Sequence, residues 1–280
     1  MKNFKRILAL MLSAVMIFAL AACGSTSEEA ADSSADAAAE ENEEAEESAS
    51  LTATDGVIVF GTNAEFAPFE YVSTTEGLID EYDGIDIAIA AAIGEALGLE
   101  VEINNMEFDS LLVALQNGQV DAVIAGMTVT EERSESVNFT TSYYAATQVM
   151  IVPEDSDITC AADMEGKTIA VIQGYTGETA VSELGYEYES FKKGSDAILE
   201  LVNGKADVVV IDSATAAKYV ADNEGLMIVE DEDVFGNEEY AIAVNKENEE
   251  LLEAINEVIE ELLADGTIAE LGDEYSVTEE

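Results

Sequence analysis

The chain of 280 residues carries 61 acidic residues against 10 lysines and arginines, which gives a formal net charge of −51 at pH 7. Phosphate binding needs a basic face, so this charge argues against nucleic acid as a partner. The chain has no histidine and only two cysteines. A Cys/His catalytic pair and a Cys/His zinc site are therefore excluded, and we expect neither a metal nor another cofactor.

Residues 1–22 are predicted to be a targeting segment. Three basic residues within the first six precede an apolar run over residues 7–20. The run is too short for a stable membrane span and suits the apolar part of a secretory signal. It ends Leu20-Ala21-Ala22-Cys23, which resembles the bacterial lipobox and implies cleavage before Cys23 and lipidation of that cysteine. The alternative is an ordinary secretory signal with a cysteine nearby.

Residues 23–50 are predicted to form a disordered, lipid-anchored tether. They are rich in Ser, Ala, Glu and Asp, with ten acidic residues between Glu28 and Glu47 and no basic one. Such a stretch cannot bury enough apolar surface to offset its ordering entropy, and its charges repel one another. If Cys23 is lipidated, Cys160 has no partner for an intramolecular disulfide. Cys160 then reads as a small buried or half-buried residue, and its role stays open.

Residues 51–280 alternate strand-like and helix-like segments. The predicted strands are 57–60, 101–103, 122–125, 148–152, 168–172, 208–211 and 240–244. The predicted helices are 85–97, 109–117, 177–184, 196–203, 214–223 and 249–264. The strands are short, β-branched and apolar on both faces, which is typical of a mostly parallel, buried sheet. The class is therefore α/β, and the length favours two lobes over one sheet.

Two similar units support two lobes. Residues 112–123 and 198–209 each read as a helix, a glycine turn and a strand that opens with aspartate, Asp121 or Asp207. Beyond each strand stand candidate contact residues: Gly126 and Thr128 after the first, Asp212 after the second. Ligands of open α/β sheets bind beyond the carboxyl ends of strands, so two lobes that face each other there would form a cleft.

Arg133 is the one arginine outside the targeting segment. A guanidinium binds a planar carboxylate through two parallel hydrogen bonds, which an ammonium cannot match. We therefore expect Arg133 to bind a planar anion such as a carboxylate. The alternative is a weak surface ion pair with Glu131, Glu132 or Glu135 on a short helix.

Over residues 56–272 the chain resembles a known family, the extracellular solute-binding proteins that serve ABC importers of polar amino acids. The motifs that carry the resemblance are 61–70 (GTNAEFAPFE), 82–86 (YDGID), 108–111 (FDSL), 126–133 (GMTVTEER), 138–139 (NF), 143–144 (YY), 174–178 (GYTGE) and 207–212 (DVVVID). Three features depart from the family pattern: Ala88 replaces an acid, residues 140–143 read TTSY, and the tryptophan near the C-terminus is missing.

The resemblance implies a two-lobed, periplasmic-binding-protein-like fold of type II, with two hinge crossings and the ligand in the interlobe cleft. The crossings are expected near residues 145–149 and 237–241. Lobe 1 would comprise residues 51–145 plus 239–280, and lobe 2 residues 146–238.

The resemblance also implies how an L-amino acid is held. Arg133 would bind the carboxylate, with a main-chain N–H and the hydroxyl of Thr128 and an N–H of Thr176. Asp212 would bind the ammonium, helped by the carbonyl of Gly126 and the Thr128 hydroxyl. The alternative for Asp212 is a helix N-cap.

Three further residues are assigned to the ligand side chain by the same resemblance. Phe66 and Phe108 would flank it, although such residues taken alone more often belong to a core. Relatives that bind basic amino acids often carry an acid where this chain has Asn63. Ile172 and Ile211 stand where glutamine-binding relatives have polar partners. We therefore predict a neutral ligand, polar to moderately apolar, with arginine or lysine as the alternative because the domain is so acidic.

The predicted function is the extracytoplasmic substrate-binding component of an amino acid ABC importer. The expected partners are the ligand, the permease, and the outer face of the cell membrane through the lipid anchor, and the family habit is a monomer. An enzyme is not expected; a sensor or a dehydratase on the same fold is the remaining alternative.

Overall fold

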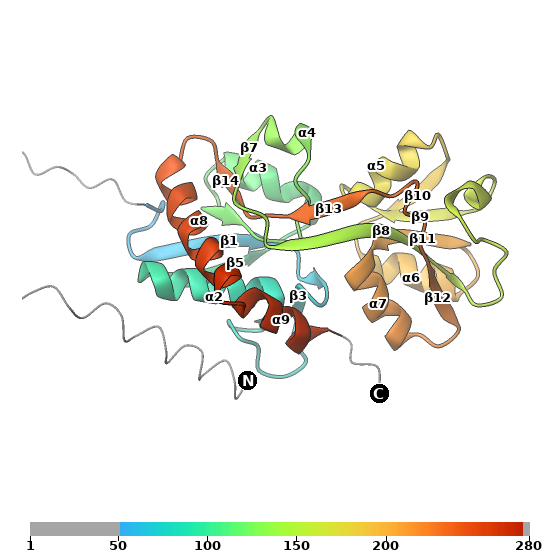
Figure 1. Ribbon diagram of the computed structural model, residues 1–280, viewed down its shortest axis with the longest axis horizontal. Helices are drawn as coiled ribbons and strands as arrows, with labels where there is room; N and C mark the ends of the chain where they lie inside the picture. Colours follow the sequence, from blue (N-terminus) through green and yellow to red (C-terminus); the bar gives the residue numbers. More distant parts are fainter. Residues whose placement is uncertain (1–50, 277–280) are drawn as a thin grey trace, which may run out of the picture. The chain divides into compact units, whose positions relative to one another are not determined.

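The computed structural model describes residues 51–276 (Figure 1), which belong to one compact unit. The predicted signal segment, Cys23 and the predicted tether lie outside the described residues. Within the described part, no helix combines the length and the apolar character that a membrane crossing needs.

The first sheet has five strands in the order β5-β1-β6-β14-β7. Their bounds are β1 Val57–Thr62, β5 Glu100–Asn105, β6 Ala122–Val123, β7 Val137–Phe139 and β14 Ala243–Asn245. β1 runs parallel to β5 and β6, whereas β14 runs antiparallel to both its neighbours. The helices of this part are α2 Ile85–Leu97, the 3₁₀ turn η1 Phe108–Ser110, α3 Leu111–Gln116, α4 Glu131–Ser134, α8 Glu249–Ala264 and α9 Thr267–Tyr275. A small sheet of β2 Glu65–Phe66, β3 Glu70–Val72 and β4 Tyr82–Asp83 lies beside them.

The second sheet has the order β10-β9-β11-β8-β12, with β13 paired to β8. Its strands are β8 Tyr144–Pro153, β9 Ile169–Ile172, β10 Tyr188–Phe191, β11 Val208–Asp212, β12 Leu226–Val229 and β13 Asn237–Tyr240. Its helices are the 3₁₀ turn η2 Ala161–Met164, α5 Thr176–Glu183, α6 Gly194–Val202 and α7 Ser213–Asp222. β9, β10 and β11 are parallel, and β8 runs antiparallel to β11 and β12. A core that includes Met150, Val171 and Val210 fills the space between this sheet and its helices.

Two strands carry the chain between the sheets. β8 leaves the first sheet region and enters the second, and β13 returns antiparallel to it, with Tyr240 opposite Tyr144 and Asn237 opposite Thr147. Figure 1 shows the two strands side by side. The first sheet thus draws on residues 57–139 and 243–245, and the second, with β13 included, on residues 144–240.

The α/β class is confirmed, and each predicted strand and helix has a counterpart, with the bounds of 85–97 and 249–264 reproduced residue for residue. Two expectations need correction. The sheets are mixed rather than mostly parallel, because the strands next to the two crossings run against the others. The segment 240–244 is two strands, since the chain passes from β13 to β14 and joins a different sheet.

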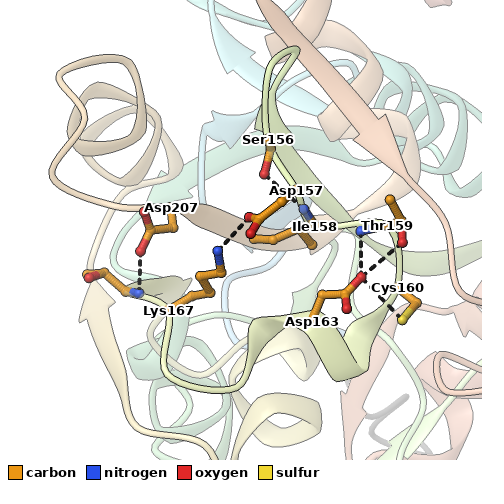
Figure 2. Close-up of polar contacts among 9 residues, drawn as sticks. Ser156, Asp157, Ile158, Thr159, Cys160, Asp163, Lys167 and Asp207 are labelled. Atoms are coloured by element: carbon orange, nitrogen blue, oxygen red, sulfur yellow. Dashed lines mark hydrogen bonds and ion pairs between the residues drawn. The ribbon is translucent and has the colours of Figure 1, made fainter.

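The two similar sequence units share a structural device. The carboxylate of Asp121 accepts from the main-chain N–H of Val59 on the neighbouring strand β1 and from Ala53, at 2.8 Å each. Asp207 accepts from the N–H of Thr168, immediately before β9, at 2.7 Å (Figure 2). In both units the aspartate fixes the start of one strand against the next.

We expect Asp121→Ala to lower the free energy of unfolding by about 2 kcal/mol, because two main-chain N–H groups lose a charged acceptor. Chemical denaturation with matched slopes would measure the loss. Asp55→Ala, in the exposed turn before β1, is the control and should stay within about 0.5 kcal/mol. An unchanged midpoint for Asp121→Ala would show that these hydrogen bonds are replaced by water without cost.

Cys160 lies just before η2 and is half-buried. Its thiol donates to Oδ2 of Asp163 at 3.5 Å, and the same oxygen accepts from the N–H and the hydroxyl of Thr159 at 2.9 Å each. Figure 2 shows these groups converging on Asp163. Cys160 therefore takes part in the polar contacts that begin the 3₁₀ turn.

Candidate functional site

One pocket between the two sheets gathers almost all the predicted ligand-binding residues. It is lined by Phe66, Phe108, Ala125, Gly126, Thr128, Arg133, Tyr175, Thr176 and Asp212. Of the eight residues predicted to bind the ligand, only Asn63 does not line it. Ala125 and Tyr175 were not predicted. Residues up to Arg133 belong to the first sheet and its connections, and the remaining three to the second.

Arg133 crosses from one sheet region to the other. Its main-chain N–H is held by the hydroxyl of Thr130, which caps α4, at 3.1 Å. The guanidinium donates from Nη1 to the carbonyl of Thr128 at 2.6 Å and from Nη2 to the carbonyl of Gly174 at 2.9 Å. Its carbon atom Cζ lies 5.2 Å from the centre of the Phe108 ring. A guanidinium has five N–H donors, so three remain for a ligand.

The predicted alternative for Arg133 was an ion pair with a glutamate of its own helix. Among residues 51–276 no such pair is found, and both hydrogen bonds of the guanidinium go to main-chain carbonyls. Burial lowers the pKa of Arg133, and the carboxylates of Asp212 and Glu238 act in the opposite direction. The group stays charged because its ordinary pKa is far above neutrality.

Asp212 ends β11 and stands at the N-cap position of α7, but its side chain makes no capping hydrogen bond. Its Oδ1 instead accepts from the hydroxyl of Tyr240 on β13 at 2.6 Å. Burial first, and then the charge of Glu238, raise the pKa of Asp212 to about 7, against the hydrogen bonds from Tyr240 and Gln148. A buried carboxylate with so high a pKa favours a cationic partner.

Glu238 on β13 was not predicted as a site residue, because no motif or local pattern marks it. Its Oε2 accepts from the hydroxyls of Thr128 and Thr176 at 2.9 Å each and from Nε2 of Gln148 at 3.2 Å. Thr128 belongs to the first sheet region, while Thr176 and Gln148 belong to the second. Glu238, on the crossing strand β13, is thus hydrogen-bonded to residues on both sides of the pocket.

These hydrogen bonds change what the two threonines can offer. Each hydroxyl gives its hydrogen to Glu238, so its oxygen can accept from a ligand ammonium but cannot donate to a ligand carboxylate. The hydroxyl contribution of Thr128 to carboxylate binding, expected from the sequence, is therefore not available in this arrangement. The N–H of Thr176, at the first turn of α5, has no acceptor within its helix and remains for an anion.

The other half of the pocket is aromatic. The ring of Tyr175 stands edge-on to Phe66 with centroids 5.4 Å apart and to Phe108 with centroids 4.6 Å apart. Asn63 lies behind Tyr175: it accepts the Tyr175 hydroxyl at 3.2 Å and donates from Nδ2 to the carbonyl of Met106 at 2.9 Å. Asn63 therefore does not line the pocket itself and contacts the lining residue Tyr175.

Gly126 needs to be glycine on two grounds. Its φ is +50°, and a Cβ there would lie 2.4 Å from Cε1 of Phe66. Its N–H donates to Oδ2 of the buried Asp86 at 2.7 Å. Burial raises the pKa of Asp86 to about 6, and that of the neighbouring Glu70 well above its ordinary value, with Asp86 adding to the second shift. Asp86 thus holds the Gly126 turn in place.

A larger cleft of about 1060 Å³ opens beside Arg133. Its acidic lining residues are Asp109, Glu132, Glu135, Glu178, Glu183 and Glu238, and Arg133 is its one basic lining residue. Acidic walls concentrate cations near an entrance and raise their rate of encounter. Within the described residues no group of His, Cys, Asp and Glu is arranged to hold a metal ion.

Two α/β sheets joined by two crossing strands, with a guanidinium and a carboxylate on the walls of the pocket between them, define a two-lobed binding protein for a small ligand that carries both charges. The sequence comparisons give the family: the chain belongs to the bacterial extracellular solute-binding proteins, family 3, whose model matches residues 58–278.

Two curated relatives illustrate the similarity. The arginine-binding extracellular protein ArtP of Bacillus subtilis is 30% identical over 95% of this chain and 96% of its own. The ABC transporter arginine-binding protein 1 of Escherichia coli is 34% identical over 78% of this chain and 90% of its own.

Solved structures of binding proteins are also similar to this chain. A mutant of ArgBP from T. maritima superposes with a TM-score of 0.73 at 41% identity, covering 79% of this chain and 95% of that one. The arginine-, lysine-, histidine-binding protein ArtJ from Geobacillus stearothermophilus gives 0.73 at 35% identity over 78% and 94%.

These relatives confirm the predicted family and the type II two-lobed fold. They also support amino-acid binding for an ABC transporter, and they are substrate-binding proteins rather than enzymes. Their names favour the basic alternative over the neutral ligand that Asn63 suggested.

Proposed function

We propose that this chain is the extracytoplasmic binding component of an amino acid ABC importer and that its ligand is a basic L-amino acid of the arginine and lysine class. The observation that carries the ligand class is the charge at the pocket. Arg133 and Asp212 line it, and Glu238 bonds directly to two lining hydroxyls.

These three groups sum to one negative charge when all are ionised. A zwitterion adds no net charge and leaves that imbalance among groups that are buried or half-buried, where an uncompensated charge is unfavourable. A ligand with a cationic side chain brings the sum to zero. Asp86, behind Gly126, adds further negative charge whenever it is ionised. Glu238 on the crossing strand thus adds a second negative charge beside the pocket.

The proposed contacts follow from the donors and acceptors left open. Two N–H groups of Arg133 take the ligand carboxylate, with the N–H of Thr128 and of Thr176. Asp212, the carbonyl of Gly126 and the Thr128 oxygen take the ammonium. Phe66 and Phe108 flank the side chain.

We assign lobe 1 to residues 51–145 plus 239–280 and lobe 2 to 146–238, with the hinge in β8 and β13. A short two-strand connection of this kind lets two lobes open and close around a ligand. The remaining features of the proposal rest on the sequence: a signal segment, a lipid anchor at Cys23, an acidic tether, a monomer, and delivery to a permease at the outer face of the cell membrane.

Calorimetry with L-arginine and L-citrulline tests the ligand class, since the two have nearly the same shape and differ in charge. The protein is first unfolded and refolded to remove carried-over ligand. We expect arginine to bind at least about 30-fold more tightly, which corresponds to about 2 kcal/mol. Glu238→Gln should reduce the ratio to about threefold, whereas Glu239→Gln, whose exposed side chain accepts from Ser142, should leave it unchanged.

Equal binding of arginine and citrulline, or tighter binding of glutamine than of either, would contradict a basic ligand while leaving amino-acid binding intact.

A further inference from the structure

Tyr175 connects the two lobes through its side chain. It follows β9 and stands at the N-cap of α5 in the second lobe, but its ring and hydroxyl contact residues of the first lobe. The ring packs edge-on against Phe66 and Phe108, and the hydroxyl donates to Oδ1 of Asn63 at 3.2 Å. Tyr175 is buried, so these contacts exclude water.

The pocket divides into two halves. Arg133, Thr128, Thr176 and Asp212 make one half polar and suited to the charged groups shared by all α-amino acids. Phe66, Phe108 and Tyr175 make the other half aromatic, where the variable side chain belongs. The cavity among all these residues measures about 10 Å³, close to the least that holds one water. The space between Phe66 and Phe108 is therefore taken by the ring of Tyr175.

We propose that Tyr175 is a specificity-determining residue that occupies the side-chain compartment between Phe66 and Phe108, and that a long ligand side chain must displace it. The inference rests on the proposed function, because it takes the same pocket as the amino-acid site. The Tyr175 hydroxyl bonded to Asn63 stands where the polar end of a long ligand side chain would reach.

Displacement has a cost that depends on ligand length. A long side chain must break the hydrogen bond to Asn63 and the two ring contacts before it can enter. Glycine and alanine also need the lobes to open, because the whole cavity measures only about 10 Å³, but they place no atoms far into the aromatic half and do not displace Tyr175. Tyr175 therefore lowers the affinity for arginine and lysine relative to an open compartment and leaves small ligands unaffected. It also stabilises contact between the lobes in the absence of ligand.

Calorimetry on the refolded full chain, with L-arginine and L-alanine as ligands, tests this inference. Tyr175→Phe removes the hydrogen bond to Asn63 and should tighten arginine binding about fivefold. Tyr175→Ser also removes the ring and should tighten it about tenfold or more. Both should leave alanine binding within about twofold. Tyr188→Phe, on β10 against the core of the second lobe, is the matched control and should change neither.

The outcomes separate this inference from the proposed function. Arginine binding by the Tyr175 variants but not by the unmodified chain would support the inference in its strongest form. Unchanged or weaker arginine binding in both variants would overturn it and make Tyr175 a wall against which the ligand packs, with the proposed function intact. No amino-acid binding by any of the proteins would overturn both. If Tyr175→Ser does not fold, as judged by its melting transition, Tyr175→Phe decides the matter alone.

Discussion

Arg133→Lys should weaken L-arginine binding by about 3 kcal/mol, more than a hundredfold, although the positive charge is kept. The guanidinium bonds to the carbonyls of Thr128 and Gly174 and still has three N–H groups for the ligand. An ammonium has three N–H groups in all, so it cannot hold both carbonyls and present two parallel donors to a carboxylate. Calorimetry would measure the loss.

The control is Lys205→Arg, at an exposed residue of the second lobe paired with Glu200, which should not alter binding. The melting temperature of Arg133→Lys without ligand should fall only slightly, because the two carbonyls can bond to water. Affinity within about threefold of the unmodified chain would remove the carboxylate role from Arg133 and revive a structural role for its contact with Gly174.

Asp212→Asn should weaken binding by about 3 to 4 kcal/mol, because the buried partner of the ligand ammonium loses its charge while its shape is kept. The hydrogen bond from Tyr240 can pass to the amide oxygen. The loss is measured by calorimetry at pH 8. The control is Asp207→Asn, which should retain full affinity. Asp207 immediately precedes β11, the strand that Asp212 ends, and it accepts a hydrogen bond from Thr168.

Asp212→Asn should also change how the stability of the fold and the ligand affinity depend on pH. The pKa of Asp212 is raised to about 7 from an ordinary value of 3.8, so between these values the folded protein holds a proton that the unfolded chain releases. Stability contributed by this group is therefore present at low pH and lost as pH rises through about 7. The ligand affinity has the opposite pH dependence. Below pH 7 the Asp212 carboxyl must lose its proton before it can bind the ammonium, so the affinity should fall about tenfold for each pH unit below 7.

Measurements from pH 5.5 to 8 on both proteins test these signs. The groups around Asp212 are Glu238, Tyr240, Gln148 and Arg133, and all remain in Asp212→Asn. Asp86, with a pKa of about 6, titrates in both proteins, so the difference between the two curves belongs to Asp212. An unmodified chain whose affinity is constant over this range would contradict a raised pKa in the free protein.

Sequence reasoning worked well where the signal was local. Helix 85–97 is bounded by two glycines and is nearly continuous in apolar residues, and helix 249–264 has a clear apolar stripe; both have their expected bounds. The order of motifs was enough for the family, which the matched region 58–278 confirms. The family resemblance also named seven of the residues that line one pocket, because its motifs carry these residues in the same order along the chain.

The ligand class was the main prediction that the comparisons did not favour. It depended on Asn63, Ile172 and Ile211, and it treated the acidity of the whole domain only as the ground for the alternative. Glu238 is one of 61 acidic residues, and nothing near it in the chain marks it as different. Its hydrogen bonds to Thr128, Gln148 and Thr176 exist only because β13 returns beside β8.

By itself the sequence determined the α/β class, the succession of elements and the family, since these follow from periodicity, turn residues and motif order along the chain. Tertiary structure alone decided which groups share the pocket. It turned Asp212 from a helix cap into an acceptor for Tyr240, added Glu238 to the charge at the site, and placed Tyr175 between Phe66 and Phe108. The physical reason is that electrostatic balance and occupied space depend on distance in three dimensions, and these residues are brought together only by the two crossings between the lobes.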